Sequence, residues 1–177
     1  MSSTEAGLSP APSGDSSGPV IRMARPSDLA AIRCIETGAF ETDRLSRRSI
    51  ARLLSSGSAR LLVAEHRGAV LGYALVLLRR TSVAARLYSL AVAPGASGAG
   101  LGHRLLQAAE AAARDAGKRT LRLEVRVDNG PAIRLYEAAG YRPIGRRDDY
   151  YEDGAAALRY ERALSLDSLT APGSAAA

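Results

Sequence analysis

The chain has 177 residues, 46% of them hydrophobic, with 24 Lys and Arg against 18 Asp and Glu and a formal net charge of +6. One cysteine excludes a disulfide framework and a multi-cysteine zinc site, and two histidines far apart in the sequence give no helix-borne metal pair. No apolar run approaches the roughly 20 residues that span a bilayer, and the polar N-terminus lacks the apolar centre of a secretory signal. These features predict a cytoplasmic protein with neither a metal site nor a membrane-spanning segment.

The positive charge is typical of proteins with an acidic partner such as nucleic acid. The arginines, however, are scattered along the chain, and aromatic residues do not alternate with them as a base-stacking surface requires. We therefore expect no nucleic-acid partner.

Ser, Gly, Pro and Ala dominate both ends of the chain, at residues 1–19 and 167–177. Such segments bury too little apolar surface to offset the entropy lost on ordering. We expect two flexible tails around one domain at 20–166.

Within that domain, hydrophobic periodicity predicts strands and helices in alternation. In chain order they are a strand at 20–24, helices at 27–40 and 46–54, strands at 60–65, 70–79 and 85–92, a helix ending before Gly117, a strand at 121–127, a helix at 132–139, and strands at 141–146 and 156–162. The order β-α-α-β-β-β-α-β-α-β-β describes an α/β (α+β) fold, one mixed sheet with helices on its faces.

The first predicted helix carries an apolar stripe through Leu29, Ile32 and Ile35. Ser27 is its predicted N-cap, and Cys34 within it is expected to be a buried thiol.

Three alternating glycines, Gly98, Gly100 and Gly102, lie where the third strand of the meander passes into the long helix. Glycine permits positive φ, so backbone N–H groups in such a loop can converge on an anion at the positive end of the helix dipole. A diphosphate is the expected ligand. A triphosphate loop is disfavoured because Arg119 follows Gly117-Lys118, and a dinucleotide fingerprint is disfavoured because it needs a third glycine where His103 stands.

Several motifs in one order carry a family resemblance. They are Leu90-Ala91-Val92-Ala93-Pro94, Ser97 to Gly102, Leu123-Glu124-Val125-Arg126, Asn129, Ala132 to Glu137, Gly140-Tyr141 and Tyr150 to Gly154. Together they resemble the GNAT (Gcn5-related) N-acetyltransferases, in particular the branch of bacterial ribosomal-protein alanine N-acetyltransferases. The resemblance implies a mainly antiparallel central sheet and acetyl-CoA as the acetyl donor.

The resemblance also implies which residues bind acetyl-CoA. The backbone of Leu90, Ala91 and Val92 would align the pantetheine arm, and the pyrophosphate would be held by Gly98, Ala99, Gly100, Leu101, Gly102 and His103. Asn129 would hydrogen-bond the pantetheine or cap the following helix, two roles that stay open. Ser97 departs from the family's usual Arg or Gln and implies weaker cofactor binding at most.

Two residues match the family's catalytic positions. Glu124, on the polar face of its strand, is the candidate general base; the alternative is an ion pair with Arg122 or Arg126. Tyr136 is the candidate general acid for the leaving thiolate, and the alternative is a core tyrosine at helical spacing.

Tyr150 and Tyr151, among acidic neighbours, would bind the acceptor, although a mixed-charge surface loop has the same composition. The expected function is transfer of acetyl to a protein N-terminal amine, by a monomer or weak homodimer. A lysine side chain or small amine is the alternative acceptor. A non-catalytic acyl-CoA sensor, favoured by Ser97, and a nucleic-acid-binding module are the functions of other classes.

Overall fold

The computed structural model describes residues 18–40, 44–98 and 100–164. The expected tails therefore lie outside the described residues, apart from Gly18 and Pro19, and so does Ala99. Within these ranges, no helix combines the length and apolar character needed to cross a membrane.

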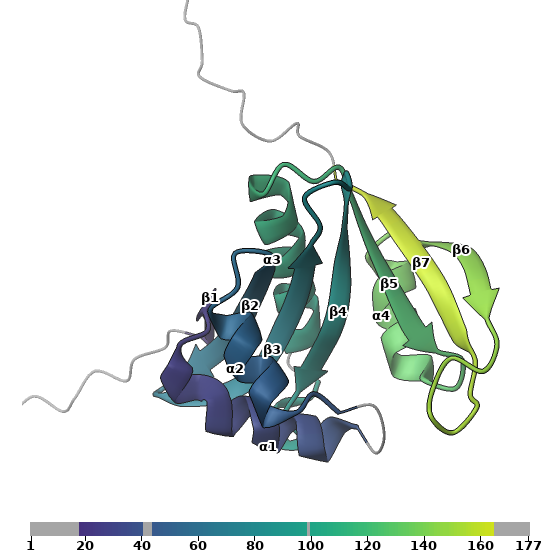
Figure 1. Ribbon diagram of the computed structural model, residues 1–177. Coiled ribbons are helices and arrows are strands. Elements are labelled where there is room, and N and C mark those ends of the chain that lie inside the picture. Colours follow the sequence, from purple (N-terminus) through teal and green to yellow (C-terminus); the bar gives the residue numbers. More distant parts are fainter. Residues whose placement is uncertain (1–17, 41–43, 99, 165–177) are drawn as a thin grey trace, which may run out of the picture.

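Seven strands of the described residues form a single sheet in the order β1-β2-β3-β4-β5-β7-β6 (Figure 1). They are β1 (Val20–Met23), β2 (Ala59–His66), β3 (Ala69–Leu78), β4 (Ala84–Val92), β5 (Thr120–Arg126), β6 (Arg142–Arg147) and β7 (Ala157–Ala163). Neighbouring strands run antiparallel except β4 and β5, which are parallel. The predicted mixed, mainly antiparallel sheet is confirmed.

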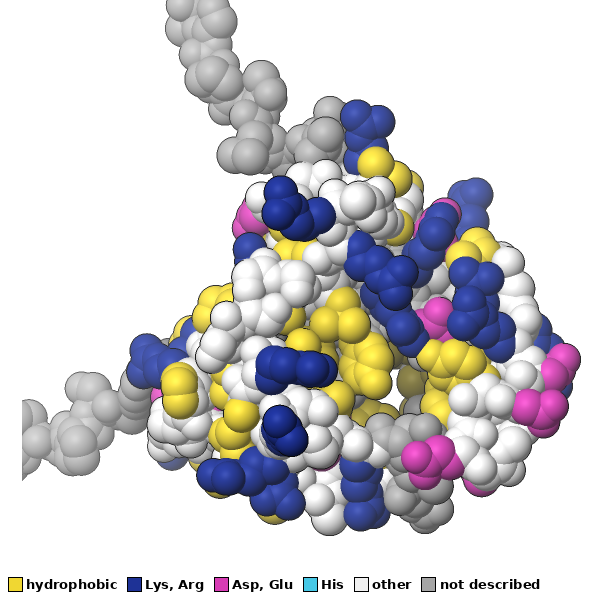
Figure 2. Space-filling view, in the orientation of Figure 1, with side chains coloured by type: hydrophobic (Ala, Val, Ile, Leu, Met, Phe, Trp, Pro, Cys, Tyr) yellow, Lys and Arg dark blue, Asp and Glu magenta, His cyan; other side chains and the backbone are white. Residues whose placement is uncertain are grey.

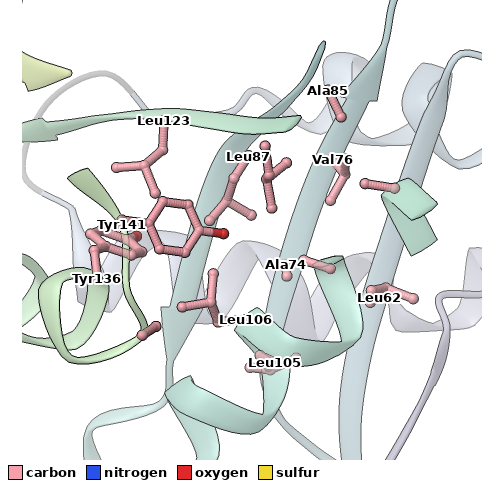
Figure 3. Close-up of a cluster of buried hydrophobic side chains, with 14 of the residues drawn as sticks. Leu62, Ala74, Val76, Ala85, Leu87, Leu105, Leu106, Leu123, Tyr136 and Tyr141 are labelled. Atoms are coloured by element: carbon pink, nitrogen blue, oxygen red, sulfur yellow. The ribbon is translucent and has the colours of Figure 1, made fainter. Parts of the chain in front are cut away.

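Helices cover both faces of the sheet (Figure 1). They are the short 3-10 turns η1 (Pro26–Asp28) and η2 (Pro94–Ala96) and the helices α1 (Leu29–Ala39), α2 (Arg47–Leu54), α3 (Leu101–Asp115) and α4 (Gly130–Ala138). Alternate residues of β2 separate two cores: Leu61 and Val63 pack with α1 and α2, whereas Leu62 and Ala64 pack with α3. The α3 core continues to Tyr136 and its neighbours on the α4 side (Figure 3).

The strands β4 and β5 pair over only part of their length and then separate. Their ladder pairs Ala84–Leu87 with Thr120–Leu123 and goes no further. On its other edge, β4 shifts register against β3: Leu75 pairs with Ser89 and Val76 with Leu87, so Tyr88 is an extra, bulged residue. A bulge bends and twists its strand, and here it lies directly after the last β4–β5 pair.

The predicted elements all form, with ends within a few residues of the expected positions. Two details of the first helix were wrong. The N-cap of α1 is Asp28 rather than Ser27, and the Asp28 carboxylate accepts the Arg25 N–H at 2.7 Å at the start of η1. Cys34 is exposed rather than buried, because it lies two residues, roughly 200° of helix rotation, from Ile32 and so faces away from the apolar stripe.

Candidate active site

A cavity of about 720 Å³ opens where β4 and β5 part. Figure 2 shows the hollow on this face of the molecule. Of the predicted site residues, the cavity brings together Leu90, Glu124, Asn129, Tyr136, Tyr150 and Tyr151. The remaining wall comes from Glu36, Ala39, Phe40, Leu45, Arg86, Leu87, Tyr88, Ser89, Val125, Arg126, Asp128, Ala132 and Asp153.

Glu124 is the first residue of β5 beyond the last pair with β4, on the face opposite the buried Leu123 and Val125. Its side chain is 12% exposed, and its Oε2 accepts a hydrogen bond from Arg86 Nε at 2.8 Å. Arg159 Nε lies 3.9 Å from Oε1. The alternative, an ion pair with Arg122 or Arg126, is not formed in the described structure; Glu124 pairs with Arg86 and lines the cavity.

Tyr136 comes from α4 and belongs both to the core and to the cavity wall. The residue is only 7% exposed, and its ring meets that of Tyr141 edge-on at a centroid distance of 5.8 Å. Burial, with a smaller effect of Tyr151, raises the pKa of Tyr136 well above its usual value. No hydrogen bond of its hydroxyl is found among the described residues, so the hydroxyl is available to a ligand.

The edge of β4 beyond Leu87 is open on the β5 side among the described residues. On the other side, Leu90, Ala91 and Val92 pair with β3. Because successive residues of a strand direct their N–H and C=O groups alternately toward the two neighbours, this stretch offers unpaired N–H and C=O groups to an extended ligand. Of the three, Leu90 lines the cavity, and Ala91 and Val92 lie further along the strand.

The glycine loop follows β4 and leads into α3. Gly98 and Gly100 have φ of +89° and +69°, and a Cβ built on either would meet no atom within 4 Å. Within the described residues, the N–H groups of Leu101 and Gly102 have no acceptor, as expected for the first turn of a helix. His103 is exposed beside them. The loop therefore has the open backbone donors that a diphosphate requires.

Asn129 is the N-cap of α4, where its Oδ1 accepts the Ala132 N–H at 3.1 Å. The capping role foreseen for it is confirmed. Because Asn129 also lines the cavity, its amide nitrogen remains available to a ligand.

Tyr150 and Tyr151 lie in the loop between β6 and β7, and both backbone N–H groups donate to Ala155 O at 3.1 Å. Their rings contact each other edge-on at 5.0 Å. The Tyr150 hydroxyl accepts a hydrogen bond from Arg86 Nη2 at 2.5 Å, which ties this loop to β4.

A model of the acetyltransferase (GNAT) family matches residues 28–141. The chain belongs to the GNAT family. It is an N-acetyltransferase of this family.

Two curated relatives cover most of this GNAT domain. A Bacillus subtilis protein, provisionally named ribosomal protein bS18-alanine N-acetyltransferase, is 32% identical over 75% of this chain and 87% of its own length. The N-alpha-acetyltransferase RimI of Mycobacterium tuberculosis is 33% identical over 63% of this chain and 70% of its own. Among solved structures, the ribosomal-protein-S18-alanine N-acetyltransferase of Escherichia coli has a TM-score of 0.73 and 27% identity, covering 88% of this chain and 99% of that one.

Sequence reasoning missed Glu36 of α1, which is 3% exposed and lines the same cavity of this GNAT domain. Its carboxylate accepts hydrogen bonds from the Tyr73 hydroxyl, from Leu45 N–H at 3.1 Å and from Ser89 Oγ at 3.4 Å. Burial, followed by the Glu36 charge, raises the pKa of Tyr73 and keeps it a donor. The signal was present: Glu36 lies four residues after Ile32, on the apolar face of the helix.

The cavity is acidic although the chain is basic. Its described lining holds four carboxylates, Glu36, Glu124, Asp128 and Asp153, against two guanidinium groups, Arg86 and Arg126. The formal excess is therefore two negative charges in a chain of net charge +6. Such a lining favours a cationic or amine ligand over an anionic one.

Proposed function

We propose that this GNAT enzyme transfers acetyl from acetyl-CoA to the α-amine of a protein N-terminus, by direct attack in a ternary complex. The observation that carries the proposal is the acidic cavity at the divergence of β4 and β5, lined by Glu124, Tyr136 and the open edge of β4.

The donor side rests on backbone groups. The open edge at Leu90 to Val92 suits a pantetheine arm, which carries amide groups that can hydrogen-bond like an added strand. The glycine loop before α3 suits the diphosphate, because its donors and the positive end of the helix dipole favour anions. Ser97 is exposed beside this loop and adds a hydroxyl instead of the longer polar side chain usual in the family.

In the proposed reaction, the neutral amine attacks the thioester carbonyl, so that a C–N bond forms and the C–S bond breaks. Glu124 receives the amine proton, directly or through one water molecule, and Tyr136 donates a proton to the departing thiolate. The raised pKa of Tyr136 keeps its hydroxyl protonated at neutral pH. A phenol is a weaker acid than a thiol, so this proton transfer requires a strong hydrogen bond from Tyr136 to the sulfur as negative charge develops there.

The acceptor is proposed from charge and amine basicity. An α-amine has a pKa near 8 and is partly neutral at pH 7, whereas a lysine amine, near 10.4, is almost fully protonated. A carboxylate base such as Glu124 therefore suffices for an α-amine. The cavity carboxylates attract its protonated form, and Tyr150 and Tyr151 offer hydroxyl groups to a peptide backbone.

A thiol-release assay with a peptide panel tests the proposal. Peptides with a free N-terminal amine should release CoA at least tenfold faster than the same peptides blocked at the N-terminus but carrying an internal lysine, and faster than polyamines. Equal or better turnover of lysine or polyamine would contradict the proposed acceptor. Acetyl-CoA binding without thiol release from any amine would instead favour the acyl-CoA sensor.

A further inference from the structure

Arg86 of β4 contacts two groups that the proposed reaction needs. Its Nε donates to Glu124 Oε2 at 2.8 Å, and its Nη2 donates to the Tyr150 hydroxyl at 2.5 Å. The guanidinium also lies over the ring of Tyr88, 5.2 Å from its centroid. One side chain thus joins β4, β5 and the β6–β7 loop across the opening of the sheet.

We propose that Arg86 is a positioning residue that orients the base Glu124 and the acceptor-binding Tyr150 together; this inference rests on the proposed function. Its position suits the role, because Arg86 and Arg122 form the second-last pair of the β4–β5 ladder and Glu124 follows directly beyond the last pair. A fork-shaped guanidinium can hold two acceptors at once in fixed geometry.

Among the described residues, Arg86 is the one side chain that hydrogen-bonds Glu124. Arg159 Nε, at 3.9 Å, is beyond hydrogen-bond distance of Glu124 and is buried without a hydrogen-bond partner in the described structure. The Arg86 side chain is 37% exposed and lines the cavity, so an acceptor entering beside Tyr150 meets it. Arg86 therefore links the orientation of Glu124 to the position of the β6–β7 loop that carries Tyr150.

Three variants test this link. Arg86→Gln removes both bonds, and we expect kcat to fall and the acceptor KM to rise, each by roughly tenfold, with the acetyl-CoA dissociation constant unchanged. Arg86→Lys replaces the guanidinium by one compact ammonium group, which can bond Glu124 but not Tyr150 at the same time. Its kcat should therefore be close to that of the wild type, while its acceptor KM stays raised. Arg122→Gln is the matched control, since Arg122 is the ladder partner of Arg86 but pairs with Glu161 outside the cavity.

Hydrogen exchange supplies a readout that does not depend on turnover. In Arg86→Gln the amides of Tyr150 and Tyr151 should exchange faster than in the wild type, and in Arg122→Gln they should not. Kinetic constants and loop exchange of Arg86→Gln within twofold of the wild type would overturn the inference. An equal loss in both variants would also overturn it, because it would indicate general destabilisation. A wild type without peptide turnover would refute the proposed function, whereas the exchange comparison would still decide whether Arg86 holds the loop.

Discussion

Leu87 of β4 and Leu123 of β5 form the last pair of the one parallel ladder in the described sheet. The residue after each, Tyr88 and Glu124, lies in the wall of the cavity. The candidate site therefore lies where β4 and β5 separate. The unpaired main-chain groups of β4 border it, and Glu124 and Tyr136 contribute side chains to its wall.

Tyr136→Phe should reduce kcat by well over tenfold while acetyl-CoA binding is kept, because the ring still fills the core and only the proposed proton donor is lost. Steady-state kinetics and calorimetry measure the two effects. Tyr141→Phe is the control: it breaks the 3.1 Å bond to Glu110, so it should lower the melting temperature and leave kcat near that of the wild type. Unchanged turnover in Tyr136→Phe would remove this residue from the mechanism.

Glu124→Gln keeps the shape of the side chain and an acceptor for Arg86, but it removes the proposed base. We expect kcat to fall by roughly 100-fold at pH 7, since positioned general bases contribute about that much or more. Thiol release at saturating peptide measures the change. A variant with wild-type turnover would show that the amine loses its proton to another group or to solvent.

Gly100→Ala should weaken acetyl-CoA binding. At φ +69° a Cβ is strained by about 1 kcal/mol, and the loop can relieve that strain only by turning its donors away from the diphosphate. Gly68→Ala is matched: its φ is +80°, its Cβ also meets nothing within 4 Å, and it lies in the β2–β3 turn. Both variants should lose similar stability in thermal melts. Equal acetyl-CoA affinity in the two would count against the loop as the diphosphate site.

Asp28 makes the stability of the fold depend on pH. Its carboxylate accepts hydrogen bonds from Arg22 and from Arg25 N–H, and these bonds hold its pKa below the usual 3.8. A carboxyl group whose pKa is lower in the folded chain stabilises the fold above its unfolded value and loses that contribution as pH falls. Asp28→Asn should therefore lower the melting temperature at pH 7, by a margin that narrows below pH 4. A constant margin across this range would contradict the assignment.

Much of this fold could be predicted because its elements are amphipathic. The alternation in β5 placed Glu124 on the polar face, and the glycine spacing located the start of α3. Both features depend only on residues close together in the sequence. Helical periodicity also held the information on Cys34 and Glu36, since it turns the first outward and the second inward.

The remaining features depend on contacts between distant segments. Glu124 and Arg86 are 38 positions apart, and they meet only because β4 and β5 pair in one particular register. The bulge at Tyr88, which coincides with the opening of the sheet, has no glycine or proline to mark it in the sequence. Local sequence patterns do not determine which strands pair or in which register, so Arg86 could not be predicted as the ion-pair partner of Glu124.

Calorimetric titration of the purified protein with acetyl-CoA tests the account most directly. The open edge of β4 and the backbone donors at the start of α3 predict saturable binding with a dissociation constant on the order of micromolar, weakened in Gly100→Ala and unchanged in Gly68→Ala. Absence of any binding heat at millimolar acetyl-CoA would contradict the account.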